Sequence, residues 1–122
     1  MIKVKAIDHV TLWVRSLAEA KLYYENIFGF ICTPRNSDKT TLVVESESVH
    51  FFLSESRGES EFITKQHISF EVESLDKIIE TLNVKGVTGY EVGEVNFFIH
   101  KNYKWCEWED PSGIRLECVE LK

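Results

Sequence analysis

Apolar and polar residues alternate in two short stretches that are copies of one another. The stretches His9-Val-Thr-Leu-Trp-Val-Arg-Ser-Leu17 and His67-Ile-Ser-Phe-Glu-Val-Glu-Ser-Leu75 align without a gap, 58 residues apart, and four of the nine positions are identical. A period of two is typical of a strand with one buried face. The pattern therefore predicts two equivalent strands, each with its histidine on the face opposite the apolar side chains.

Each predicted strand leads into a helix. Ser16 with Glu19 three residues later forms a capping box, and Ser74 is a plain N-cap. We expect helices over residues 17–27 and 75–82, ended by Gly29 and Gly86.

Strand-like runs follow each helix, at residues 30–33, 41–45 and 49–54 in the first half and at 89–92, 96–99, 104–109 and 114–121 in the second. Turn residues separate them, among them Asn36-Ser37-Asp38 and Asp110-Pro111-Ser112-Gly113. The N-terminal residues 1–8 read as an alternating strand, and the polar residues 57–65 as a linker. The chain is thus predicted to be βαβββ twice, an α+β fold in one domain over residues 1–122, with module 1 at about 1–56 and module 2 at about 66–122.

Composition narrows the functional classes. A chain of 122 residues with 43% hydrophobic residues suffices for one domain with its own core. The net charge of −6 opposes nucleic acid binding, and no apolar run is long enough to span a membrane. Cys32, Cys106 and Cys118 form no Cys-x-x-Cys pair, so we expect buried free thiols and a cytoplasmic, unexported protein.

The repeated histidines are the best candidates for chemistry. Two copies of one unit are usually related by an approximate twofold axis, so the imidazoles of His9 and His67 should converge between the modules. Imidazole is a common ligand of Zn, Fe, Ni and Mn. Glu117 interrupts an apolar strand, where a carboxylate is costly unless it is paired or bound to a cation. These three residues predict a metal site with open coordination positions.

Further polar and aromatic residues are expected on the same inner surface: Thr11, Trp13, His50, Phe52, Ser69, Trp105, Glu107 and Arg115. Glu107 is a candidate acid or base, or else a solvent-facing carboxylate. Arg115 could clamp an anionic substrate, or form a salt bridge to Glu117 or Glu107.

Three ordered motifs together resemble the vicinal-oxygen-chelate superfamily, which includes glyoxalases, bleomycin-resistance proteins and ring-cleaving dioxygenases. They are Ile7-Asp8-His9-Val10-Thr11-Leu12, then Gln66-His67-Ile68-Ser69-Phe70-Glu71-Val72, then Asp110-Pro111-Ser112-Gly113 with Glu117 four residues on. The resemblance implies two βαβββ modules forming a cup-shaped mixed sheet, and a divalent metal held at His9, His67 and Glu117. It also implies a homodimer and a small-molecule substrate chelated through two oxygens.

Departures from the family pattern limit the choice of reaction. Glyoxalase I relatives have a fourth ligand, Glu or Gln, where the alignment places Phe52, with His50 two residues earlier as a conceivable replacement. The tyrosine expected in fosfomycin-resistance transferases is replaced by Glu107. The expected function is a metal-dependent enzyme with lyase, isomerase or transferase chemistry. The alternative is a metal-free protein that sequesters a ligand, similar to the bleomycin-resistance branch.

Overall fold

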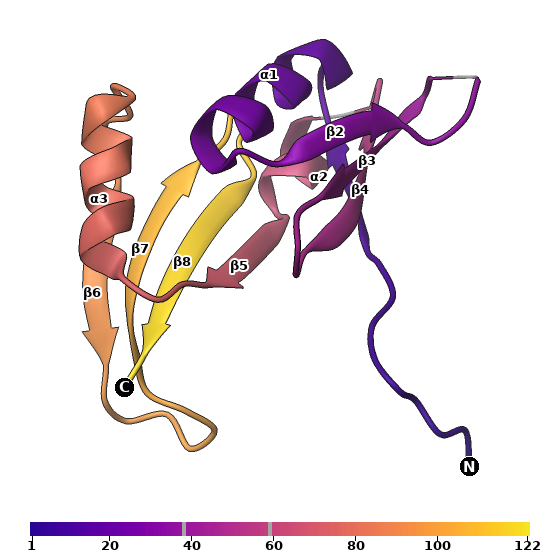
Figure 1. Ribbon diagram of the computed structural model, residues 1–122. Coiled ribbons are helices and arrows are strands. Elements are labelled where there is room, and N and C mark those ends of the chain that lie inside the picture. Colours follow the sequence, from indigo (N-terminus) through magenta and orange to yellow (C-terminus); the bar gives the residue numbers. More distant parts are fainter. Residues whose placement is uncertain (38, 59) are drawn as a thin grey trace. The chain divides into compact units, whose positions relative to one another are not determined.

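Each half of the chain folds as a βαβββ module in the computed structural model, which describes residues 1–37, 39–58 and 60–122 (Figure 1). The first consists of β1 (Thr11–Val14), α1 (Leu17–Phe28), β2 (Ile31–Pro34), β3 (Thr41–Glu45) and β4 (His50–Glu55). After α2 (Ser60–Thr64), the second consists of β5 (His67–Glu71), α3 (Leu75–Val84), β6 (Glu91–Val95), β7 (Tyr103–Glu109) and β8 (Arg115–Leu121). The predicted α+β class and the duplicated module are confirmed. The chain divides into two compact units, Met1–Ile63 and Thr64–Lys122, called here the first and second unit.

The two sheets have the same topology. The strand order is β1-β4-β3-β2 in the first unit and β5-β8-β7-β6 in the second. In both, the first strand pairs parallel with the last, and the other pairs are antiparallel. A parallel pair needs a crossover connection, and the helix together with the two intervening strands supplies it.

The helix starts follow the predicted capping chemistry, repeated in each unit. The Ser16 hydroxyl accepts a hydrogen bond from the Glu19 amide at 3.2 Å, and Ser74 does the same for the Lys77 amide at 3.3 Å. A glutamate at or near the end of the last strand of each unit also accepts a hydrogen bond from the first amide of the helix. Glu55 of β4 accepts from Leu17 at 3.0 Å, and Glu120 of β8 accepts from Leu75 at 2.8 Å. None of the helices in the described ranges is long and apolar enough to cross a membrane.

One face of each sheet is covered by its helix and forms the core. In the first unit the buried apolar residues include Leu12, Val14, Ala20, Tyr24, Cys32, Leu42, Val44, Phe51 and Leu53. In the second they include Leu75, Leu82, Cys106, Trp108, Leu116 and Cys118. Because side chains alternate along a strand, the intervening residues project from the opposite face. We call this the open face of each sheet.

Two predicted strands are wrong, and the predicted linker is partly helical. Residues 96–99 form no strand, because β6 already pairs along β7 from Glu91 to Val95 and the next residues connect the two strands. Residues 1–8 form no strand, because the ladder of β1 begins only at Thr11, opposite Phe52. The predicted linker contains α2, whose Ile63 is fully buried. Of the predicted turn and linker, Asp38 and Glu59 lie outside the described residues.

The three cysteines are free and buried, as the sequence predicts. Burial raises the pKa of Cys32 and Cys106 to about 11 and that of Cys118 to about 12, because a thiolate is poorly solvated there. We expect almost no reaction with a thiol-specific disulfide reagent at pH 8 in the native protein, and three equivalents in denaturant. Rapid native labelling would contradict the burial.

The same thiols make stability depend on pH in the alkaline range. Their folded pKa values lie above the ordinary 9.0, so their contribution is fully present below about pH 9. As the pH rises toward 11, the unfolded chain loses thiol protons first and the free energy of unfolding falls. Urea unfolding between pH 8 and pH 10.5 measures this loss.

Candidate metal centre

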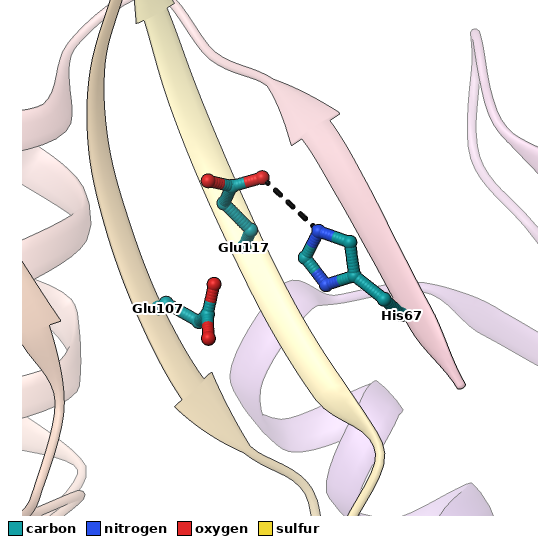
Figure 2. A group of neighbouring side chains, drawn as sticks. All are labelled: His67, Glu107 and Glu117. Carbon is teal, nitrogen blue, oxygen red and sulfur yellow. Dashed lines mark ion pairs between the residues drawn. The ribbon is translucent and has the colours of Figure 1, made fainter. Parts of the chain in front are cut away.

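Three ligand-type side chains meet on the open face of the second sheet. His67 lies on β5, Glu117 on β8 and Glu107 on β7, so three neighbouring strands each supply one (Figure 2). One ligand atom from each lies within 4.8 Å of the other two. An imidazole and two carboxylates at this spacing are a donor set that suits a divalent metal such as Zn, Mn or Fe.

The register of β8 places Glu117 in this group. Asp110 begins the turn before β8, and its carboxylate accepts hydrogen bonds from the amides of Ser112 and Ile114 at 2.8 Å and 2.9 Å. Gly113, with φ of 92°, completes the turn. The ladder then sets Ser69 and Glu107 on either side of Glu117. The Asp-Pro-Ser-Gly motif therefore acts by fixing which β8 residues reach the open face.

His67 has only one ring nitrogen left for a cation. Its Nδ1 donates to the backbone carbonyl of Arg115 at 3.1 Å, because a carbonyl oxygen can only accept. Nε2 lies 3.3 Å from a carboxylate oxygen of Glu117, whose side chain is only 12% exposed. A lone pair on Nε2 and the carboxylate oxygen would face each other here, so a cation between them would contact both groups. A fixed Nδ1–H with a free Nε2 is the usual arrangement of a metal-binding histidine.

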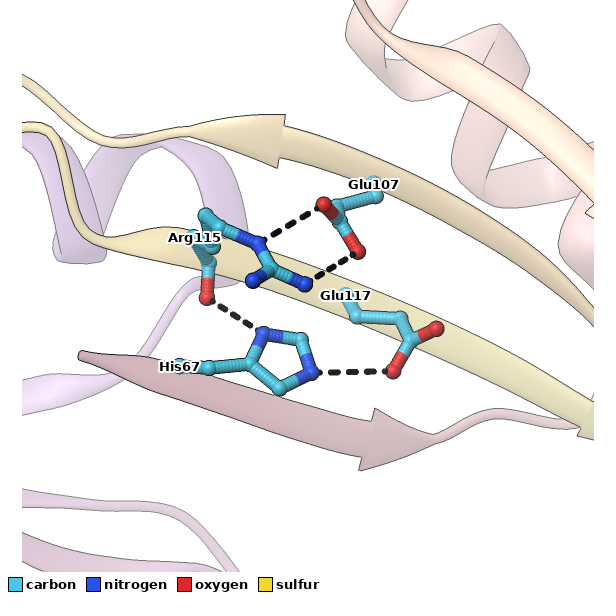
Figure 3. Close-up of polar contacts among 4 residues, drawn as sticks. All are labelled: His67, Glu107, Arg115 and Glu117. Atoms are coloured by element: carbon cyan, nitrogen blue, oxygen red, sulfur yellow. Dashed lines mark hydrogen bonds and ion pairs between the residues drawn. The ribbon is translucent and has the colours of Figure 1, made fainter. Parts of the chain in front are cut away.

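Arg115 pairs with Glu107 beside this contact. Its Nε and Nη2 donate to the two carboxylate oxygens of Glu107 at 2.9 Å and 3.3 Å (Figure 3). The pair holds the pKa of Arg115 above its ordinary value. Glu107 and Glu117 face each other across β7 and β8, where two like charges repel. Arg115 offsets that repulsion and holds the Glu107 carboxylate in place.

A cavity of about 290 Å³ adjoins Glu117 on the open face. Ser69, a predicted site residue, lines it together with Glu71, His100, Lys101, Tyr103 and Val119. The sequence interpretation missed His100, Lys101 and Tyr103, because residues 100–103 fell between two predicted strands. The parity of Tyr103 with Trp105 and Glu107 along β7 was the signal that could have found it.

The other predicted histidine, His9, lies in the first unit immediately before β1. Its Nδ1 contacts the carboxylate of Asp8 at 2.7 Å, and this hydrogen bond lowers the pKa of Asp8. Its ring stacks on Phe52, with centroids 4.2 Å apart. Both repeated histidines thus engage Nδ1 with an oxygen acceptor and leave Nε2 for another partner.

Equivalent positions in the two units differ in chemistry. Thr11 faces Phe52 in the parallel ladder of the first unit, and Ser69, its copy in the repeat, faces Glu117 in the second. Phe52 therefore stands where Glu117 stands in the other sheet. By the same register His50 corresponds to Arg115, and it is exposed, with its ring 5.6 Å from that of Phe52.

The remaining predicted residues lie on the open faces without joining the group in Figure 2. Thr11 and Trp13 line a hollow of the first unit. The Trp105 ring covers Gly93, leaving no room for a Cβ atom there. The structure thus brings His67, Glu107, Arg115 and Glu117 together within the second unit, whereas a ligand role for His9 stays a prediction.

Comparison with known proteins identifies the family. The family model described as Glyoxalase/Bleomycin resistance protein/Dioxygenase superfamily matches residues 6–118. No curated protein sequence matches the chain.

Solved structures share the fold along the whole chain. A glyoxylase/bleomycin resistance protein/dioxygenase domain from Frankia sp. EAN1pec is 24% identical, with 98% of this chain and 100% of that one covered and a TM-score of 0.75. The bleomycin resistance determinant encoded on transposon Tn5 is 13% identical (97% and 99% covered, TM-score 0.72). Lactoylglutathione lyase from Agrobacterium tumefaciens is 17% identical (97% and 95% covered, TM-score 0.70). The match of the family model over nearly the whole chain shows that this protein belongs to the glyoxalase, bleomycin resistance and dioxygenase superfamily.

Proposed function

We propose that this protein is a divalent-metal-dependent enzyme that acts on a small oxygenated substrate. The observation that supports this most is the contact between His67 Nε2 and Glu117, 3.3 Å apart. The other ring nitrogen of His67 already donates to a carbonyl, and the Glu117 side chain is only 12% exposed. A cation between these two groups would be bound by the imidazole and the carboxylate together.

His67, Glu117 and His9 are the proposed metal ligands, and Ni, Zn, Mn and Fe all suit two imidazoles and one carboxylate. The chemistry that a bound divalent metal supplies in such a site is Lewis-acid polarisation of two chelated substrate oxygens. Glu107 is close enough to the other donors to be a ligand as well. Its ion pair with Arg115 favours a different role, because coordination would compete with those two hydrogen bonds.

Glu107 is the proposed acid or base. Arg115 holds both of its oxygens, which fixes the carboxylate beside the donor atoms of His67 and Glu117. From there Glu107 would take a proton from the substrate, or return one, next to the polarised oxygens. The cavity of about 290 Å³ beside Glu117 is large enough for a small molecule, and the hydroxyl groups of Ser69 and Tyr103 can hydrogen-bond to it.

Elemental analysis tests this proposal directly. Protein purified without chelator or affinity-tag metal is expected to carry close to one equivalent of Ni, Zn, Mn or Fe, and His67→Ala is expected to lose it. His100→Ala is the matched control, because it removes an exposed imidazole of the same unit that is not a proposed ligand.

We propose in addition that the protein is a homodimer. Light scattering on the same preparation measures its mass and tests this proposal.

Absence of metal in the wild type, with none taken up from added salts, would contradict the enzyme proposal. The metal-free alternative would then be favoured, a protein that binds a ligand without chemistry. The similarity in fold to the Tn5 bleomycin resistance determinant gives that alternative its support.

A further inference from the structure

The open face of the first sheet has a hollow that is lined by residues of the first unit alone. It has a volume of about 340 Å³ and is lined by Thr11, Trp13, Arg35, Thr40, Thr41, Ser54 and Glu55. Three of these match the lining of the cavity in the second unit through the ladder register: Thr11 corresponds to Ser69, Trp13 to Glu71, and Ser54 to Val119. The same place in the fold is thus hollow in both units, with different chemistry in each.

Arg35 gives this hollow its charge. It follows β2, and its amide donates to the carbonyl of Thr41 at 2.9 Å, which continues the ladder and keeps its side chain on the open face. The guanidinium carbon lies 5.6 Å from the centre of the Phe52 ring. Arg35 is an exposed residue, so a ligand in the hollow can approach its guanidinium donors.

Glu55, the carboxylate in the lining, faces away from the hollow. It follows Ser54 on β4, so alternation directs its side chain to the face covered by α1. There one of its oxygens accepts from the Leu17 amide at 3.0 Å. The positive charge of Arg35 is therefore the charge that a molecule in the hollow would meet.

Two buried hydroxyls in the lining add a hydrogen-bond donor. The hydroxyl oxygens of Thr41 and Ser54 lie 2.7 Å apart, and the residues are 4% and 8% exposed. Their mutual bond uses one of the two hydroxyl hydrogens, which leaves one to donate elsewhere. Trp13, 38% exposed, adds an aromatic surface beside them.

We infer that this hollow binds the carboxylate of a planar organic acid. Arg35 would bind the carboxylate oxygens through its fork of donors, the Thr41 and Ser54 pair would donate the further hydrogen bond, and the ring of Trp13 would pack on the planar group. This inference goes beyond the proposed metal chemistry and does not rest on it, because none of the lining residues is a proposed metal ligand, acid or base.

Calorimetric titration of the chelator-treated full-length protein with benzoate tests this site. Benzoate is expected to bind the wild type and the His67→Ala variant equally. Arg35→Gln is expected to weaken binding by about 10-fold or more, because a hydrogen bond to a charged group is typically worth ~1.5–3 kcal/mol. Arg57→Gln removes the same charge from an exposed position outside the lining and is expected to leave the affinity unchanged.

Two probes separate the parts of the inference. Benzamide, which keeps the planar ring without the charge, and inorganic phosphate, which keeps an anion without the ring, should each bind at least about 10-fold more weakly than benzoate. Equal benzoate affinity in Arg35→Gln, or no benzoate binding by the folded wild type, would overturn the site. Because the titration is made without metal, its failure is distinct from a failure of the metal proposal.

Discussion

Glu117→Gln is expected to lower the affinity for divalent metal more than about 100-fold, since even partners that only orient a ligand are typically worth ~10–100-fold. The substitution keeps the size of the side chain and removes the charge. It also places an amide against His67 Nε2, where a carboxylate oxygen lay at 3.3 Å. Competition with a chromogenic chelator measures the affinity, and circular dichroism checks that the variant is folded.

Two companion variants decide the third ligand. We expect His9→Gln to weaken metal binding strongly and Glu107→Gln to weaken it by less than about 10-fold, as befits a residue that acts next to the ligands. A larger loss of metal affinity in Glu107→Gln than in His9→Gln would assign the metal to His67, Glu107 and Glu117 within the second unit. The predicted ligand role of His9 would then be wrong. Unchanged affinity in Glu117→Gln would contradict the whole site.

Phe51→Ala is expected to destabilise the protein by about 3–5 kcal/mol, the usual loss for truncating a buried aromatic side chain. Phe51 is 2% exposed and lies on the α1 side of β4. Its ring packs edge-on against Tyr24 and Phe30, with both pairs of centroids 6.1 Å apart. Equilibrium unfolding in urea gives the change in free energy.

The next residue along β4 is a matched control. Phe52 lies on the open face and is only half-buried, so Phe52→Ala removes the same atoms without opening a cavity in the core. We expect a clearly smaller loss of stability from Phe52→Ala. Equal losses from the two variants would contradict the division of β4 into a core face and an open face.

The repeat made the fold predictable from the sequence. Alternation around Leu12 and Ile68 gives two strands, and Ser16 and Ser74 mark the helix starts that the structure has. Apolar runs between turn residues then indicated the remaining strands. The apolar pattern wrongly predicted a strand at residues 96–99. A strand needs a partner with unpaired backbone groups, and β6 already pairs with β7 in this part of the sheet.

The residues of the candidate site could be proposed from the sequence, but their contacts could not. His67 and Glu117 follow from strand parity and from the cost of a carboxylate on an apolar strand. The sequence could not choose between the two roles of Arg115, and the structure pairs it with Glu107. Arg35 was missed because it follows β2 in a turn, and only the ladder with Thr41 brings it to the open face. Such contacts depend on the register between neighbouring strands. Alternation shows which face a side chain takes, but it allows registers that differ by two residues.

Phe52 stands in the first sheet where Glu117 stands in the second, and the two residues make different demands on their surroundings. A charged group on a sheet face costs free energy unless a cation or donor compensates it, whereas an aromatic ring there gains by stacking on His9. The apolar position therefore keeps its stability without a ligand, whereas the acidic position depends on the cation or hydrogen-bond donors beside it. The two halves of this chain thus differ in what they need from their surroundings, although they share one fold.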